Sequence, residues 1–141
     1  MIIKIPVKPY VKKYLIGRYG MQHTITKSSF LGFLVYDRLN KDFDPKTEYK
    51  GLDDVYEVEL TNWVFKSQGH SVSKNQLLAI GHALYLLFRE DCFEYVESEQ
   101  KKAGNATKAL KEFLNKYEIR EDDLKFETIY RDYKRKKFAK S

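Results

Sequence analysis

The sequence is poor in the residues that most catalytic and metal sites require. It has a single cysteine, Cys92, so no disulfide can form within the chain, and its three histidines, His23, His70 and His82, lie far apart. The histidines do not have the spacing of metal ligands, and Cys92 has no neighbouring base in the sequence to activate its thiol. HExxH, nucleophile-elbow and phosphate-binding glycine motifs are also absent. We therefore expect a protein that is not an enzyme, with no catalytic residues, no metal and no cofactor.

A cluster of acidic residues in the middle of the chain offers the one alternative, a Mg²⁺-dependent nuclease site. Carboxylates would supply the metal ligands. Strand alternation, however, places Glu57 and Glu59 on the face opposite Tyr56 and Val58, which is typical of a solvated strand face. We favour that simpler interpretation. The cluster consists of Asp53, Asp54, Glu57 and Glu59.

Long apolar runs are missing as well. The uncharged run from Asn75 to Phe88 is shorter than the about 20 apolar residues that cross a bilayer. The first ten residues, MIIKIPVKPY, lack the long apolar segment and small-residue cleavage site of a signal peptide. We expect no membrane partner and a cytoplasmic location.

What the sequence does contain is enough apolar material for a core. The chain has 141 residues, of which 43% are hydrophobic and 15% aromatic, so a single domain over residues 1–141 is expected. The most apolar stretch is Ser73 to Val96, where apolar residues recur at helical spacing on more than one side. It predicts a central buried helix, with Ser73 as its N-terminal cap.

The first half of the chain mixes strand and helix patterns. Residues 1–8 alternate as a strand, and Pro6 favours an edge position because it has no N–H to donate. A helix is expected from Pro9 to about Arg18, ended by Gly17 or Gly20. Residues 21–27 are interpreted as a polar connector, residues 41–54 as a loop, and residues 55–65 as a second strand.

Between these segments, residues 30–40 predict a helix capped by Ser28 or Ser29, with a strand as the alternative, because a short apolar run fits both. Beyond the central helix, Gly104 is expected to end it, and Asn105 or Thr107 to cap a helix that runs to Tyr117. After a turn, a last helix should begin near Asp122. The predicted fold is α+β and mostly helical: a central buried helix, a small antiparallel sheet, and a C-terminal helix-turn-helix-like hairpin at about residues 105–137.

Basic residues gather at both ends of the chain and acidic residues in the middle, within a net charge of +6. Cations at the end of the last helix fit phosphate contacts in DNA, in particular a duplex, although the helix dipole alone also favours them there. If the two ends meet in space, they would form one positive face. The predicted nucleic-acid-binding residues are Lys12, Lys13, Arg131, Lys134, Arg135, Lys136 and Lys137.

Tyrosines lie among these basic residues, including Tyr10 and Tyr14 near one end and Tyr130 and Tyr133 near the other. Their rings could stack on unpaired bases. Tyrosines at helical spacing are more commonly core residues with a solvated hydroxyl, and we favour that interpretation.

Two segments resemble parts of known proteins: KPYVKKYLIGRYG near the start and IREDDLKFETIYRDYKRKK near the end. They are similar to small uncharacterised basic proteins of phages and mobile elements of Bacteroidetes-type bacteria. The resemblance implies an accessory protein of a phage or mobile element that binds DNA in the bacterial host cell. The alternative function is a structural or assembly protein, such as a virion component, that forms a homo-oligomer or binds a phage protein.

Overall fold

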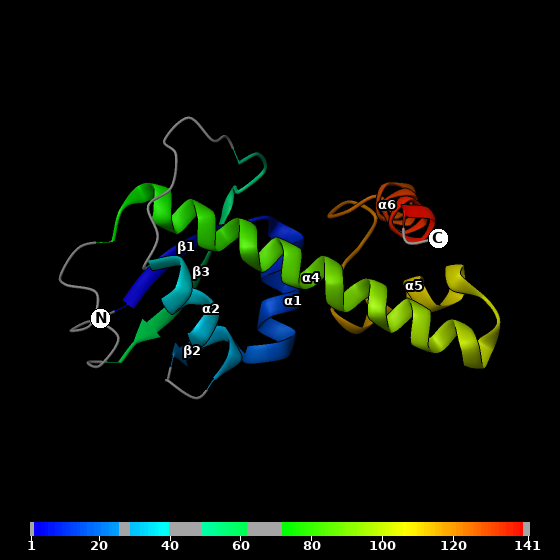
Figure 1. The fold of residues 1–141 in the computed structure, drawn as a ribbon, viewed down its shortest axis with the longest axis horizontal. Helices are drawn as coiled ribbons and strands as arrows, with labels where there is room; N and C mark the ends of the chain where they lie inside the picture. The colour runs from blue at the N-terminus through cyan, green and yellow to red at the C-terminus, as the bar shows by residue number, and fades with distance from the viewer. Residues whose placement is uncertain (1, 26–28, 40–48, 62–71, 140–141) are drawn as a thin grey trace. The chain divides into compact units, whose positions relative to one another are not determined.

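The computed structural model describes residues 2–25, 29–39, 49–61 and 72–139, except for the side chains of Tyr36, Ala103 and residues 137–139. The chain forms two compact units, Met1–Leu86 and Leu87–Ser141, and the division between them falls within one helix, α4 (Lys74–Ala103). The fold is α+β and mostly helical, as predicted (Figure 1).

The first unit is built on a three-stranded sheet with strand order β1-β3-β2. Strand β1 (Ile2–Val7) lies at one edge, as the position of Pro6 predicts, and pairs antiparallel with β3 (Asp54–Leu60). Strand β2 (Gln22–Ile25) pairs parallel with β3 on its other side. The antiparallel pairing of the two predicted strands is therefore confirmed, whereas the unpredicted parallel strand β2 makes the sheet mixed.

Strand β2 also corrects the interpretation of residues 21–27 as a connector. Its sequence, QHTI, is short and mostly polar, and Ile25 is its one fully buried side chain. Such a strand is formed by its hydrogen bonds to β3 rather than by an apolar pattern of its own. A parallel neighbour needs a crossover connection, and α2 (Phe30–Leu39) lies in the chain between β2 and β3.

Helix α2 confirms the helical interpretation of residues 30–40 over the strand alternative. Its first turn is capped by Ser29, whose Oγ accepts a hydrogen bond from the Gly32 N–H at 2.9 Å. The preceding helix, α1 (Pro9–Tyr19), begins at Pro9 and is capped at its C-terminus by Gly20, whose φ of 96° favours glycine.

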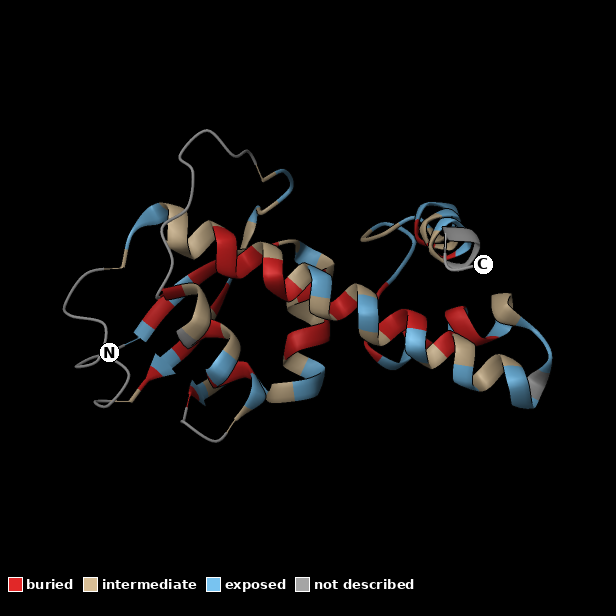
Figure 2. Ribbon diagram, in the orientation of Figure 1, coloured by how far each residue is buried: buried red, intermediate tan, exposed pale blue. Residues whose placement is uncertain are grey.

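One face of the sheet is buried and the other is not. Strand residues at alternate positions, such as Ile5 and Tyr56, are fully buried, whereas Ile2 and Val55 on the opposite face are exposed (Figure 2). Helix α1 adds three fully buried side chains to this core. These are Val11, Tyr14 and Leu15.

Helix α4 contributes to both units. Its start is a capping box: the Gln76 N–H donates to Ser73 Oγ at 3.1 Å, and the Ser73 N–H donates to Gln76 Oε1 at 2.8 Å. The cap predicted at Ser73 is therefore confirmed. Among the core residues that α4 supplies are Ile80, Leu84, Phe88, Cys92 and Val96.

The second unit contains residues 87–103 of α4, followed by α5 (Ala106–Lys116) and α6 (Phe126–Ala139). Gly104 ends α4 with a φ of 69°, and Asn105 Oδ1 caps α5 by accepting from the Lys108 N–H. Both breaks were predicted. Aromatic contacts join α4 to α5, with Phe88 and Phe113 rings 5.9 Å apart.

The last helix begins later than predicted, at Phe126 rather than near Asp122. The reason is a local turn: the Arg120 N–H donates to the Asp123 carboxylate at 2.9 Å, and the Asp123 N–H donates to the Arg120 carbonyl at 2.9 Å. Residues 117–125 thus connect α5 to α6. This connector is longer than the three- to four-residue turn typical of a DNA-binding helix-turn-helix.

Candidate nucleic-acid interface

Helix α6, which carries most of the predicted DNA-binding residues, is fixed to the second unit along one side. Ile129 and Tyr133 are buried, at 3% and 2% exposure. The Tyr133 hydroxyl donates to Gln100 Oε1 of α4 at 3.0 Å, and its ring lies 5.6 Å from that of Phe93. At its first turn, the Phe126 N–H donates to Glu121 Oε2 at 2.9 Å. The helix therefore presents one defined face to solvent.

That face carries three exposed cations, and the exposed carboxylate of Glu127 lies among them, one turn before Arg131. Arg131, Lys134 and Arg135 are exposed, and at about 100° per helical residue all three point away from the side that carries Ile129 and Tyr133. Together they form what we call the α6 basic face. Lys136 is half-buried, with Nζ 5.3 Å from the centre of the Phe93 ring. The side chain of Lys137 lies outside the described residues.

Lys12 and Lys13, the two residues of α1 that were predicted to bind DNA, are less exposed than the three cations of the α6 basic face. Lys12 Nζ forms an ion pair with Asp54 Oδ1 at 3.2 Å, and Lys13 is half-buried. Both belong to the first unit, whereas α6 belongs to the second. That the two basic ends form one surface stays a prediction.

Two stacked aromatic rings with a lysine at each end lie along one flank of the α6 basic face. The Phe126 and Tyr130 rings are nearly parallel, at 18°, with centres 5.5 Å apart. Lys134 Nζ lies 4.6 Å from the centre of the Tyr130 ring, and Lys111 Nζ of α5 lies 5.4 Å from that of Phe126. We call these four residues the aromatic–lysine row.

The structure separates the tyrosines that the sequence grouped. Tyr133 is a core residue with a hydrogen-bonded hydroxyl. Burial raises the pKa of this hydroxyl most, and the charges of Glu97 and Tyr130 raise it further. Tyr130 is half-buried and belongs to the aromatic–lysine row. Phe126 and Lys111 were not predicted as site residues. The signal for Phe126 was its position four residues before Tyr130 on the same helix.

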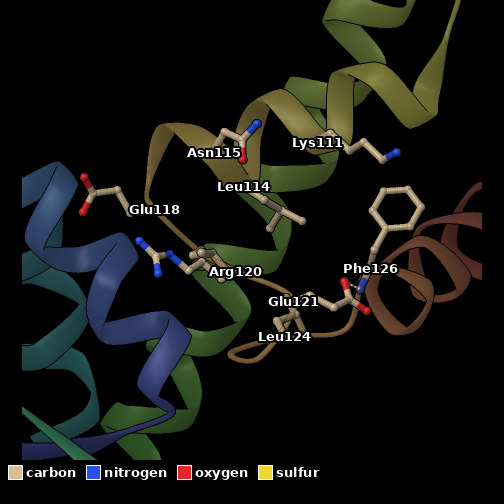
Figure 3. A pocket seen from close by; sticks show the side chains of 9 residues that line it. Lys111, Leu114, Asn115, Glu118, Arg120, Glu121, Leu124 and Phe126 are labelled. Atoms are coloured by element: carbon tan, nitrogen blue, oxygen red, sulfur yellow. Dashed lines mark hydrogen bonds between the residues drawn. The ribbon is translucent and has the colours of Figure 1, made fainter.

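An open groove of about 550 Å³ adjoins Phe126. Figure 3 shows the Phe126 ring and Lys111 at one end of this groove, and Glu118 and Arg120 toward the other. The Glu121 carboxylate is turned toward the Phe126 N–H, to which it is hydrogen-bonded. The remaining lining residues are Leu114, Asn115, Ile119 and Leu124.

The residues considered for catalysis have other environments. His82 packs between the rings of Tyr49 and Tyr85, at 5.0 and 5.9 Å, and its pKa is lowered first by burial and then by the charges of Lys8 and Arg38. Burial, and then the charge of Asp91, raises the pKa of the Cys92 thiol to about 12, so the thiolate nucleophile is not formed near neutral pH.

The acidic alternative gains no support from the geometry. Glu59 is exposed and Glu57 half-buried on the strand face opposite Tyr56 and Val58, as the alternation predicts. Within the described residues, no group of three or more His, Cys, Asp or Glu side chains is arranged to hold a metal ion. His70 lies outside those residues.

Comparison with known proteins adds no relative. No family model, curated protein or solved structure matches the chain. Among the helices that the structure describes, none combines the length and the apolar character that a bilayer crossing requires.

Proposed function

We propose that this chain is a non-enzymatic DNA-binding protein that contacts phosphates through the α6 basic face. The observation that carries the proposal is the exposure of Arg131, Lys134 and Arg135 on one side of a helix whose other side is fixed by Ile129 and Tyr133. A helix held in this way presents its cations in one orientation. It can therefore follow a row of phosphates without first ordering its own backbone.

The connector between α5 and α6 refines the mode of binding. Because residues 117–125 are longer than a helix-turn-helix turn, the proposal rests on phosphate contacts by α6 and not on insertion of a recognition helix into the major groove. Such contacts are independent of base sequence and sensitive to salt. Lys136 lies over the Phe93 ring, on the side of α6 that packs against α4, so it is not counted among these contacts.

The biological setting is part of the proposal. The terminal segments that resemble small basic proteins of phages and mobile elements support an accessory role in such an element. The DNA partner would then be that of the element or its bacterial host, and the protein would act in the host cytoplasm.

The proposal is tested by fluorescence anisotropy with labelled duplex and single-stranded DNA over a salt series. Replacing Arg131, Lys134 and Arg135 together by glutamate should abolish binding at moderate salt. The matched control replaces Lys101, Lys102 and Lys108, which are exposed on α4 and α5, by glutamate, with the same change in net charge. The control should keep most of the affinity. If the unmodified protein binds neither duplex nor single-stranded DNA, or if both variants lose affinity equally, the proposal is contradicted.

A structural or assembly role is the second candidate, and exposed aromatic residues of the first unit favour it. Phe30 and Phe33 lie three residues apart on α2 and are 61% and 65% exposed. Rings placed this way are typical of a surface that contacts another protein chain. In this case, the protein should sediment as a discrete oligomer that dissociates when both are replaced by serine, whereas the triple glutamate variant of α6 should assemble normally.

A further inference from the structure

Helix α6 offers more than cations, because the aromatic–lysine row runs beside its basic face. Duplex DNA holds its bases stacked inside the helix, where a protein ring beside the backbone cannot reach their faces. Single-stranded nucleic acid exposes those faces, and proteins that bind it combine basic residues with aromatic rings. The row combines both in one place, with Lys111, Phe126, Tyr130 and Lys134 in contact one after another.

We infer that the polynucleotide bound by α6 is single-stranded, and that one unpaired base stacks on Phe126 in the groove between α5 and α6. This inference rests on the proposed function and names its substrate class. The Phe126 ring is half-buried, so it is held in place and still reaches the groove. The groove of about 550 Å³ falls within the range of roughly 300–1,000 Å³ usual for small-molecule sites, which suits a single nucleotide.

Different residues that line the groove suit the base and the phosphate of a nucleotide. Leu114, Ile119 and Leu124 supply an apolar floor for a base, and the Asn115 amide can both donate to and accept from its polar edge. Lys111 Nζ now lies over the Phe126 ring at 5.4 Å from its centre. A base that stacks there displaces this ammonium group, which is then free to pair with the phosphate of the same nucleotide.

The charges of the groove fit this orientation. The Glu121 carboxylate accepts a hydrogen bond from the Phe126 N–H, so it is occupied in capping α6. Glu118 and Arg120 lie toward the end away from Phe126 (Figure 3). The positive charge next to Phe126 comes from Lys111, and the strand would leave the groove toward Lys134 and the α6 basic face.

The spacing along α6 suits a short stretch of strand. Phe126 and Lys134 are eight residues apart, which is about 12 Å along a helix at 1.5 Å per residue. That distance corresponds to about three to four nucleotides at the roughly 3.4 Å rise of a stacked strand. One base in the groove and the following phosphates on Lys134, Arg131 and Arg135 would therefore form one continuous site.

The test compares a labelled oligothymidylate with a duplex of equal length, using the full chain. Replacing Phe126 by leucine keeps an apolar side chain but removes the ring, and should weaken single-strand binding about tenfold or more while changing duplex binding less than about twofold. The matched control is Leu86→Ala on α4, an exposed apolar side chain outside the site, which should change neither affinity.

A second variant distinguishes the loss of the ring from a folding defect in Phe126→Leu. Phe126→Trp keeps a stacking ring, so it should retain single-strand affinity, and its added indole emission should be quenched by oligothymidylate beyond any change seen in the unmodified protein. Unchanged or equally reduced binding of both nucleic acids by Phe126→Leu, or no quenching in Phe126→Trp, would overturn the inference and leave the proposed function standing. If the unmodified protein binds neither nucleic acid, both are overturned.

Discussion

The backbone of Gly81 in α4 lies directly against the carbonyl group of Pro6 in β1. A Cβ built on Gly81 would overlap the Pro6 carbonyl oxygen, which real Cβ atoms essentially never do, and would lie a tight 3.0 Å from the carbonyl carbon. Because Gly81 lies inside a helix and Pro6 in an edge strand, neither can move without disturbing the packing of the first unit. The missing side chain at Gly81 is thus what allows α4 to approach the sheet.

Replacing Gly81 by alanine should therefore destabilise the protein by about 1–3 kcal/mol, the usual range for an overpacked core, despite the better helix propensity of alanine. Chemical denaturation followed by circular dichroism would measure this loss. The control is Gly17→Ala in α1, at an exposed glycine, which should be neutral or stabilise by up to about 1 kcal/mol. Equal stability of the two variants would contradict the close approach.

The unfolding free energy should fall at alkaline pH because of Cys92. Its thiol has a pKa raised from 9.0 to about 12 by burial and, less strongly, by Asp91. Because the folded protein holds the thiol proton more tightly than the unfolded chain does, the protonated thiol favours the folded state. This contribution to the unfolding free energy is complete below pH 9 and is lost as the pH rises toward 12. Between these values the slope is at most about 1.4 kcal/mol per pH unit for one group.

The unfolding free energy of Cys92→Ala should accordingly fall less between pH 9 and 11 than that of the unmodified protein. The difference in unfolding free energy between the two proteins should therefore narrow as the pH rises. Tyr56 provides a second check. Burial, followed by the charge of Tyr19, raises its pKa from 10.0 to about 12, and its hydroxyl donates to the Gly20 carbonyl at 2.9 Å. Because ionisation of the Tyr56 hydroxyl affects stability only above pH 10, Tyr56→Phe should reduce the fall of the unfolding free energy with pH above pH 10 and not below it. Parallel pH profiles for all three proteins would refute these assignments.

Elements of this fold with local causes could be predicted from the sequence. The caps at Ser73 and Asn105 use hydrogen bonds to residues three positions away, so a short window of sequence contains both partners. Strand β2 could not be found in this way, because residues 22–25 become a strand by pairing with β3, more than thirty residues later. The start of α6 differs from the prediction although its cause is local: an aspartate can either begin a helix or close a turn, and Asp123 closes a turn with Arg120.

The candidate site divides along the same line. Exposure of Arg131, Lys134 and Arg135 follows from helical periodicity once Ile129 and Tyr133 are recognised as core residues. The contact of Lys111 with Phe126 joins two helices, and no local pattern indicates it. The ion pair of Lys12 with Asp54 joins residues far apart in the chain, so it too was invisible in the sequence.

The salt dependence of binding should count the phosphate contacts. If Arg131, Lys134 and Arg135 each neutralise one phosphate, they contribute about 2–3 to the slope of log affinity against log salt concentration, at roughly 0.7–0.9 per contact. Replacing one of them by glutamine should reduce the slope by about one contact. Titration of the single variants between low and moderate salt would measure this, and unchanged slopes would exclude these residues from the interface.

Lys12 is expected to contribute little to DNA binding, because its ammonium group is paired with Asp54 Oδ1 at 3.2 Å, with both side chains only about a third exposed, at 34% and 39%. Lys12→Gln should change affinity less than about twofold, whereas Lys134→Gln should weaken it clearly. Asp54→Asn releases Lys12 from its partner without adding a cation. If the first helix does contact DNA, that variant should bind more tightly than the unmodified protein; equal affinity would confine the interface to the second unit.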